Sequence, residues 1–479
     1  MGSATGFLDT AKQENPFRRE EERLMDFEDL HLPQPPEARH AQASRCMNCG
    51  VPFCQSGFGC PLHNLIPEWN DLLCRGQERE ALNRLLRTAP FPEFTGHVCP
   101  ALCEKACNLE NESVTNRDNE LYLIETGFAR GWVQPRIPAM RTGRRIAVIG
   151  SGPSGLAAAD LLNRRGHQIA VFEKADRPGG LLMYGIPNMK LPKAVVERRI
   201  RLMEAEGIRF RLNTEADLEQ LAEYDAVLLC GGSRRPRPLN VEHADAQGVM
   251  YAVDYLTAAT RGLLSGENEV SAEGKQVVVV GGGDTGNDCV GTALRQGCAS
   301  VAQLEMMPAP PAERSENNPW PEWPRILRTD YGQREAAFRQ GGDPRIYETT
   351  VHRILTDGKG ALSGLATVRL HRTPEGEFAL VPGSERRMAC GMLLIAAGFI
   401  GCEEKTLECF SLTADARGRL IPENGSHHLG GNLFSAGDMR TGQSLVVRAL
   451  ADGREAALEV DAWLKKAEGF SETKKWFCL

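Results

Sequence analysis

Seven of the fifteen cysteines fall in two short clusters before residue 108. Their spacing reads, in order, Cys46-x2-Cys49-x4-Cys54-x5-Cys60 and Cys99-x3-Cys103-x3-Cys107. Closely spaced thiolates, with a proline after one cysteine of each cluster, are typical of iron–sulfur sites. Structural zinc is the alternative, but one zinc takes four ligands and would leave three thiols over. Two 4Fe–4S clusters would need eight ligands, so that interpretation requires one ligand that is not a cysteine.

A glycine-rich turn at residues 150–155 could bind the pyrophosphate of a dinucleotide. From Arg144 the sequence predicts a buried strand, this turn, a helix that ends near Gly166, and a second strand. Glycines there let backbone N–H groups approach a pyrophosphate at the start of the helix. Glu173 ends the second strand, where a carboxylate can accept hydrogen bonds from ribose, and Lys174 follows it. The predicted contacts in the turn are Gly150, Gly152, Pro153, Ser154 and Gly155.

The same pattern of strand, turn, helix and strand returns from Lys275. Its turn consists of Gly281, Gly282, Gly283, Asp284, Thr285 and Gly286. Glu305 ends the following strand, and an acid there favours the free 2′-hydroxyl of NADH. The nearest arginine that could bind the 2′-phosphate of NADPH is Arg314, in a proline-rich loop at 308–324 whose residue types indicate no chemistry of their own. Local chemistry therefore leaves NADH and NADPH open.

Segments further along the chain indicate that the first turn binds FAD. Residues 433–445 join an apolar strand to Gly437 and Asp438, where Asp438 could bind a ribityl hydroxyl. The pyrimidine end of the flavin is expected near Gln443, Ser444 and Leu445, and the loop 181–192, opened by Gly180 and Leu181, beside the ring. Apolar strands within 227–239 and 392–399 end in small-residue turns, at Gly232 and Gly398, which are typical of crossings between a flavin domain and an inserted nicotinamide domain. Because the cofactors supply the chemistry, we expect no catalytic nucleophile or general base.

These motifs must be positioned by more than one domain in a chain of 479 residues. The expected fold is α/β, with two Rossmann-like dinucleotide-binding domains preceded by a mainly helical iron–sulfur domain. The expected bounds are 1–140 for the iron–sulfur domain, 141–265 with 391–479 for the FAD domain, and 266–390 for the inserted NAD(P)H domain. Apolar residues at helical spacing within 65–86 predict helices between the two cysteine clusters.

Composition argues against several classes of protein. The formal net charge of -7 disfavours nucleic acid as a partner. No apolar run approaches the ~20 residues of a membrane-spanning helix, and the N-terminus lacks the apolar region of a signal peptide. We therefore expect a cytoplasmic protein that does not bind membranes, in a reducing compartment that disfavours disulfides.

The order of these motifs closely resembles the small (β) subunit of bacterial glutamate synthase. The resemblance covers nearly the whole chain except the N-terminal tail, and rests on RCMNCGVPFC, GCPLHNLIPEWNDL, FPEFTGHVCPALCEKAC, GSGPSGLAAA, GGLLMYGIPNMKL, GGGDTGND, NPWPEWP and AGDMRTGQSLVV. The same module is similar to the N-terminal part of dihydropyrimidine dehydrogenase and to the large subunit of NADH-dependent ferredoxin:NADP oxidoreductases.

The resemblance implies an NADPH-dependent oxidoreductase that acts as an electron-input subunit. Hydride would pass to FAD, and electrons through two 4Fe–4S clusters to a large subunit that carries FMN and the glutaminase and makes L-glutamate from L-glutamine and 2-oxoglutarate. The chain begins Met-Gly-Ser, without an N-terminal cysteine nucleophile, so the glutaminase is expected on that other polypeptide. NADPH is implied by the resemblance alone, against the local interpretation of Glu305.

The resemblance also implies an assignment of the cluster ligands. One cluster would be bound by Cys46, Cys49, Cys54 and Cys107, and the other by Cys60, Cys99 and Cys103. The missing ligand would be an oxygen donor after the last cysteine, with Glu120 the first choice and Glu125 the second.

Three alternatives belong to other functional classes. A flavin-dependent disulfide reductase would need a redox-active pair near the second turn, where only Cys289 and Cys298 lie, with eight residues between them. A non-enzymatic scaffold stabilised by zinc would keep the nucleotide-binding folds without their cofactors and would serve only to bind a partner. An NAD(P)H:ferredoxin oxidoreductase would keep the chemistry and change the electron acceptor, which the sequence does not exclude.

Overall fold

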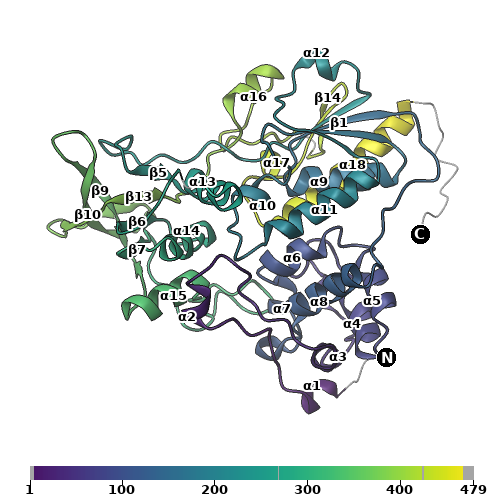
Figure 1. Cartoon of the computed structure of the whole chain (residues 1–479), viewed down its shortest axis with the longest axis horizontal. Helices are drawn as coiled ribbons and strands as arrows, with labels where there is room; N and C mark the ends of the chain where they lie inside the picture. The colour runs from purple at the N-terminus through teal and green to yellow at the C-terminus, as the bar shows by residue number, and fades with distance from the viewer. Residues whose placement is uncertain (1–4, 268, 423–424, 468–479) are drawn as a thin grey trace.

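The computed structural model describes residues 5–267, 269–422 and 425–467. A helical N-terminal part packs below one mostly parallel sheet, and a second, fully parallel sheet lies to the side (Figure 1). This arrangement confirms the predicted α/β fold with a helical N-terminal part.

Short helices joined by loops form the N-terminal part. Their bounds are α1 Gly6–Asp9, α2 Glu20–Arg23, α3 Pro36–Ser44, η1 Phe53–Gln55, α4 Ile66–Cys74, α5 Glu78–Leu85, α6 Pro92–Val98, α7 Leu102–Lys105, η2 Glu110–Glu112 and α8 Asn116–Ala129. The helices predicted within 65–86 are α4 and α5. In α4 the side chains of Ile66, Trp69 and Leu73 form one apolar face, which is buried in the core. The loops between these helices carry the cysteine clusters.

The first sheet has the strand order β14-β15-β4-β1-β2-β3. Its strands are β1 Arg145–Ile149, β2 Gln168–Phe172, β3 Arg209–Arg211, β4 Ala226–Leu229, β14 His428–Gly430 and β15 Leu433–Ser435, all parallel to their neighbours except β14. The predicted helix after the first turn is α9, Pro153–Arg164. Figure 1 shows α9, α11 (Lys193–Ala205) and α18 (Val446–Ala467) between this sheet and the helical part. Shorter helices are α10 Leu181–Tyr184, α12 Leu218–Leu221, α16 Glu404–Cys409 and α17 Asp438–Thr441.

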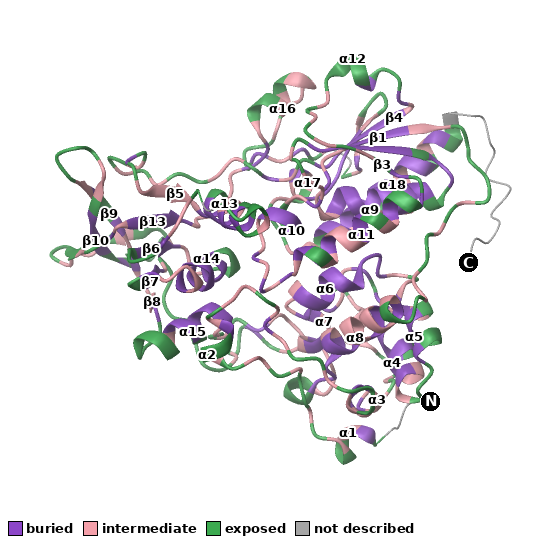
Figure 2. Cartoon of the chain, in the orientation of Figure 1, coloured by how far each residue is buried: buried purple, intermediate pink, exposed green. Residues whose placement is uncertain are grey.

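The second sheet is parallel throughout, in the order β5-β13-β6-β7-β8. Its strands are β5 Val249–Tyr251, β6 Gln276–Val280, β7 Ser300–Leu304, β8 Arg345–Ile346 and β13 Met392–Ile395, and its helices are α13 Ala252–Ser265, α14 Asp284–Arg295 and α15 Tyr331–Gln340. Between β8 and β13 in the sequence, four more strands form an antiparallel sheet: β9 Thr349–Thr356, β10 Leu362–Arg372, β11 Phe378–Leu380 and β12 Arg386–Met388. Figure 2 shows the central strands buried and the outer hairpin loops exposed.

The two turns predicted as crossings between domains lie side by side. The N–H of Arg237 donates to the carbonyl of Gly398 at 2.9 Å, and the N–H of Ile400 donates to the carbonyl of Arg235 at 2.8 Å. The two connections to the second sheet therefore pair with each other through one antiparallel bridge, between Pro236 and Phe399.

The segment 17–31 connects three parts of the molecule. Arg23 forms a buried ion pair with Glu335 of α15 at 2.8 Å. The N–H of Leu30 donates to the carbonyl of Met189, in the predicted flavin loop. His97 of α6 lies 3.2 Å from Asp29. This segment thus fixes the second sheet against the helical part. Among the described residues, no helix is long and apolar enough to cross a membrane.

Candidate functional site

Four of the predicted cluster ligands line one pocket. Cys46 follows α3, Cys54 lies on η1, and Cys107 follows α7. With Cys49 they surround a single pocket in the helical part, which we call the first cysteine pocket. The structure therefore brings together the four cysteines that the resemblance assigns to one cluster.

The other three cysteines, Cys60, Cys99 and Cys103, line a separate pocket, which we call the second cysteine pocket. Glu120 of α8 lines the same pocket and accepts a hydrogen bond from the Thr95 hydroxyl. Glu125, the second choice, instead pairs with Arg198 at 2.5 Å. The geometry favours Glu120 of the two carboxylates, and its role as a ligand stays a prediction.

The sulfur atoms are poorly suited to carry charge without a bound cation. The pKa of Cys60 is raised to about 11 and those of Cys46 and Cys99 to about 12, mainly by burial, with smaller contributions from neighbouring cysteines at Cys46 and Cys99 and from Glu120 at Cys60 and Cys99. Burial also raises the pKa of Glu120 to about 7. A bound metal would hold such groups in their charged forms. No disulfide joins the cysteines among the described residues.

Two neighbouring pockets fit two iron–sulfur groups better than one zinc ion. Ile66 lines both pockets, so they are adjacent. A single tetrahedral zinc would fill one pocket and leave the buried thiols of the other without a partner. Arg117 also lines the second pocket, and it is a residue that the spacing of the cysteines gives no signal for.

The first glycine turn leaves room for a ligand at its centre. Gly150 has φ +102°, and a Cβ there would lie 2.5 Å from the carbonyl oxygen of Cys230. A Cβ on Gly155 would overlap the carbonyl of Gly150, so these two glycines allow strand and helix to approach closely. A Cβ on Gly152 would meet nothing within 4 Å. The open space at Gly152, at the N-terminus of α9, is where a pyrophosphate would bind.

Other predicted flavin residues gather around this turn. Glu173 accepts the N–H of Ser151 at 3.1 Å, so the carboxylate is tied to the turn itself. A Cβ on Gly180 would lie 3.0 Å from the Cα of Gly152. A Cβ on Gly437 would overlap the hydroxyl of Ser154, the second residue of α9, which begins with Pro153. These residues come from separate elements and converge on one place.

The remaining predicted flavin residues lie near the start of α18 or at the rim of the site. Ser444 donates to Asp438 at 3.1 Å, and burial raises the pKa of Asp438 to about 6. Leu445 packs against the main core, while Leu181 is partly exposed. Gly232 has open space beside it. Lys174 instead forms an ion pair with Glu403 at 2.8 Å, so its side chain is already engaged.

The second glycine turn has the same construction. Gly281 has φ +126° and lies against the carbonyl of Ala396, whereas a Cβ on Gly283 would meet nothing within 4 Å. Gly286 packs against the Gly281 carbonyl. Asp284 and Thr285 are exposed at the start of α14.

The other three residues predicted to bind the nucleotide, Glu305, Gly398 and Arg314, lie outside this turn and contact other protein groups. The carboxylate of Glu305 lies against Gly282 and accepts the N–H of Met307 at 2.9 Å. Gly398 lies close to Gln443, since a Cβ on Gly398 would be 2.7 Å from the Gln443 amide. This contact joins the predicted nucleotide site to the predicted flavin site. Arg314 donates to the carbonyl of Asn318 within its own loop.

Two lysines position the predicted flavin loop. Lys190 pairs with Asp288 of α14 at 2.9 Å, which ties the loop to the second glycine turn. Burial alone would lower the pKa of Lys190, but Asp288 and two further carboxylates nearby raise it, which favours the charged ammonium. The Lys193 ammonium donates to the carbonyls of Leu182 and Ile186, and burial lowers its pKa to about 7. The sequence predicts neither role, because the folded structure determines which groups each lysine contacts.

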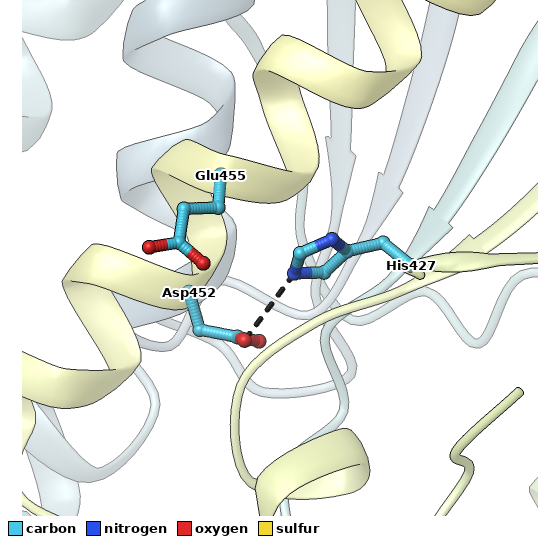
Figure 3. A group of neighbouring side chains, drawn as sticks. All are labelled: His427, Asp452 and Glu455. Carbon is cyan, nitrogen blue, oxygen red and sulfur yellow. Dashed lines mark hydrogen bonds and ion pairs between the residues drawn. The ribbon is translucent and has the colours of Figure 1, made fainter. Parts of the chain in front are cut away.

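His427, Asp452 and Glu455 lie together between the edge of the first sheet and α18 (Figure 3). His427 contacts Asp452 at 3.3 Å through Nε2 and Glu459 at 2.9 Å through Nδ1. Burial alone would lower the pKa of His427, but these two carboxylates raise it.

The same network supports the predicted flavin turn. Asp452 accepts the N–H of Gly437 at 2.6 Å and pairs with Arg440 at 2.7 Å. Both nitrogens of His427 are already engaged by carboxylates. We therefore interpret this group as the hydrogen-bonded support of the turn at Gly437 and Asp438.

Replacing Asp452 by asparagine is expected to weaken FAD binding about tenfold, because one charged acceptor that holds the Gly437 N–H, His427 and Arg440 is lost. A fluorescence titration of the deflavinated protein with FAD measures the change. Glu455→Gln is the matched control on the same helix, since Glu455 is exposed. Equal FAD affinity of Asp452→Asn and the unmodified protein would contradict this role.

The cysteines required by a disulfide reductase are poorly placed. Cys289 and Cys298 are both buried in the core of the second sheet. Burial raises the pKa of each thiol, which disfavours the reactive thiolate.

Comparison with known proteins gives two family matches. Residues 23–132 match the family described as dihydropyrimidine dehydrogenase domain II, 4Fe-4S cluster, and residues 144–320 match pyridine nucleotide-disulphide oxidoreductase. The Glutamate synthase [NADPH] small chain of Bacillus subtilis is 45% identical, over 97% of this chain and 99% of that protein. The chain belongs to the glutamate synthase small-chain family. The resemblance predicted from the motifs is therefore confirmed, as is the enzyme class, an oxidoreductase with an iron–sulfur and a pyridine nucleotide domain.

One more relative and one solved structure place this member of the glutamate synthase small-chain family in context. Glutamate synthase [NADH] of Schizosaccharomyces pombe is 44% identical over 95% of this chain, which corresponds to only 22% of that longer protein. The structure of FprA from Mycobacterium tuberculosis, in complex with NADPH, superposes with a TM-score of 0.53 at 18% identity, covering 70% of this chain and 87% of FprA. That similarity shows a shared fold.

Proposed function

We propose that this chain is the electron-input subunit of a glutamate synthase. It would oxidise NADPH and supply electrons to a separate large subunit, which carries FMN and the glutaminase and makes L-glutamate from L-glutamine and 2-oxoglutarate. When bound, FAD accepts hydride from the nicotinamide, and two 4Fe–4S clusters carry single electrons onward. The observation that carries this proposal is the position of the second cysteine pocket beside the start of α18, next to the predicted flavin residues, with the first cysteine pocket adjacent to it.

Two apolar residues support this path. Val447, near the start of α18, lines the second cysteine pocket, and it follows Leu445 of the predicted flavin site by two residues. Ile66 separates the second pocket from the first. We propose that the protein holds its cofactors in this order and excludes water between them, which is the protein's contribution in cofactor chemistry.

The proposed ligand sets follow the geometry described above. One cluster is assigned to Cys46, Cys49, Cys54 and Cys107, and the other to Cys60, Cys99, Cys103 and Glu120. FAD is assigned to the turn at 150–155 with the residues that converge on it, and NADPH to the turn at 281–286. The proposed domains are 1–140, 141–265 with 391–479, and 266–390, whose ends include residues outside the described part of the chain.

NADPH is proposed as the reductant because the Bacillus subtilis relative is an NADPH protein that matches along nearly its full length. The Glu305 carboxylate accepts the N–H of Met307. We propose that Arg314, on the loop that follows, binds the 2′-phosphate.

We expect Arg314→Ala to raise the KM for NADPH about tenfold or more, because a charge-assisted hydrogen bond to phosphate is lost, and to leave the KM for NADH unchanged. Steady-state reduction of a dye with each nucleotide measures the difference. Arg325→Ala is the matched control, since that side chain is 72% exposed. An equal rise in KM for NADPH and NADH would show that Arg314 stabilises the loop and does not bind the 2′-phosphate.

Anaerobic purification from the native host tests the proposed partner, in the cytoplasm where we expect the complex. The proposal predicts a large polypeptide in equal amount, with a cysteine at its mature N-terminus, and NADPH oxidation that depends on both L-glutamine and 2-oxoglutarate. Purification with a ferredoxin-type partner, and no glutamate formation, would instead support an NAD(P)H:ferredoxin oxidoreductase.

A further inference from the structure

The proline-rich loop 308–324 is braced by one buried side chain. Asn318 is 1% exposed, and its amide donates to the carbonyl of Trp323 and to Glu322, each at 3.1 Å. Its side-chain oxygen accepts the N–H of Arg325 at 2.8 Å. The loop therefore has a defined shape, and the tryptophan at position 320 is held in a fixed direction.

Trp320 reaches from the part of the chain that carries the second sheet to the helical part. Its indole N–H donates to the carbonyl of Cys107 at 3.1 Å, across 213 positions of sequence. Its ring meets that of Phe53 edge-on, with 4.9 Å between centroids. Cys107 and Phe53 both line the first cysteine pocket. Trp323 contacts a different group, the guanidinium of Arg328 at 3.8 Å.

We propose that Trp320 is a positioning residue for the first iron–sulfur site: it fixes Cys107 through the carbonyl and, with Phe53, covers the first cysteine pocket against water. The inference rests on the proposed assignment of Cys46, Cys49, Cys54 and Cys107 as ligands. The loop follows β7 and Glu305, so the part of the chain proposed to bind the nicotinamide nucleotide also completes the first cysteine pocket of the helical part.

Two consequences follow for a cluster bound there. Hydrogen bonding around the ligands and exposure to solvent set the reduction potential of an iron–sulfur site. Water admitted to the pocket would stabilise the more negative reduced form and raise the midpoint potential. Water and oxygen would also reach the iron more readily, so the site would lose iron faster in air.

Trp320→Ala and Trp320→Phe test this role in the anaerobically purified full chain, with Trp323→Phe as the matched control in the same loop. The readouts are iron loss in air, followed by absorbance, and the EPR spectrum and midpoint potential of each cluster. For Trp320→Ala we expect roughly fivefold faster loss of half of the iron, because one hydrogen bond and one ring contact that keep the pocket closed are removed. Trp320→Phe should keep the ring cover, lose the hydrogen bond, and shift one EPR signal. Trp323→Phe should behave like the unmodified protein.

The outcomes separate this inference from the proposed function. Normal iron content with unchanged bleaching, EPR and potential in both Trp320 variants would overturn the inference and leave the proposed function intact. Equal acceleration in Trp323→Phe would also overturn it, since the effect would then belong to the loop as a whole. Absence of iron from the unmodified protein would contradict the proposed function and this inference together.

Discussion

Replacing Cys49 by alanine is expected to remove one cluster and nearly abolish glutamate formation, while NADPH-dependent dye reduction continues. Cys49 lines only the first cysteine pocket, so the second pocket and the predicted flavin site keep their ligands. Iron should fall from about eight to about four atoms per chain. Glutamate formation with the large subunit should fall by about 100-fold, the upper end of the effect of weakening a metal site, whereas dye reduction should stay within about twofold.

The matched control for this variant is Cys74→Ala. Cys74 lies on α4 and packs against the same core, but it lines neither cysteine pocket. It should retain full iron and full glutamate formation. If dye reduction by Cys49→Ala collapses while FAD is retained, the two half-reactions are not separable in the way the structure indicates.

Gly152→Val and Gly283→Val are expected to abolish the binding of one dinucleotide each. Both glycines have ordinary extended backbone, and an added Cβ would meet no protein atom within 4 Å. The fold should therefore tolerate valine, while the side chain occupies the place where backbone N–H groups meet a pyrophosphate. Gly152→Val should purify without FAD, and dye reduction should fall by more than about 100-fold because the hydride acceptor is missing.

Gly283→Val should keep FAD and iron at normal levels and lose affinity for NADPH by at least about tenfold, since the helix N-terminus becomes inaccessible. FAD content, iron content and the KM for NADPH distinguish the two variants. Gly342→Val is the control, because Gly342 also has open space beside it and lies outside both turns. Loss of FAD from Gly283→Val, with Gly152→Val unaffected, would reverse the assignment of the two sites.

Much of the fold could be predicted because its signals are local. The strands β1 and β6 are apolar runs that end in glycines, and the helices α9 and α14 begin directly after them. The partition of seven cysteines into two pockets came from the resemblance, since spacing alone places Cys60 next to Cys54 and gives no reason to separate them. The structure separates these two cysteines because η1 and the loop after it turn Cys60 toward α6 and α8.

The residues that the sequence did not reveal act through partners distant in the chain. Lys190 meets Asp288 across 98 positions, and Trp320 meets Cys107 across 213. The first pair depends on how the flavin loop packs against the helix α14, and the second on how the proline-rich loop packs against the helical part, which no local pattern encodes. At Lys174 a local signal predicts a contact that the tertiary structure does not favour. Its position beside Glu173 suggests a cofactor contact, but its ammonium pairs with Glu403.

Metal and flavin content of the anaerobically purified chain tests the central claim most directly. Iron, acid-labile sulfide, zinc and FAD are measured on the same sample. Two cluster sites beside one flavin site predict about eight iron and eight sulfide per FAD, with no stoichiometric zinc. One zinc per chain without iron, or a flavoprotein that contains no metal, would contradict the proposal that electrons leave the flavin through the two cysteine pockets.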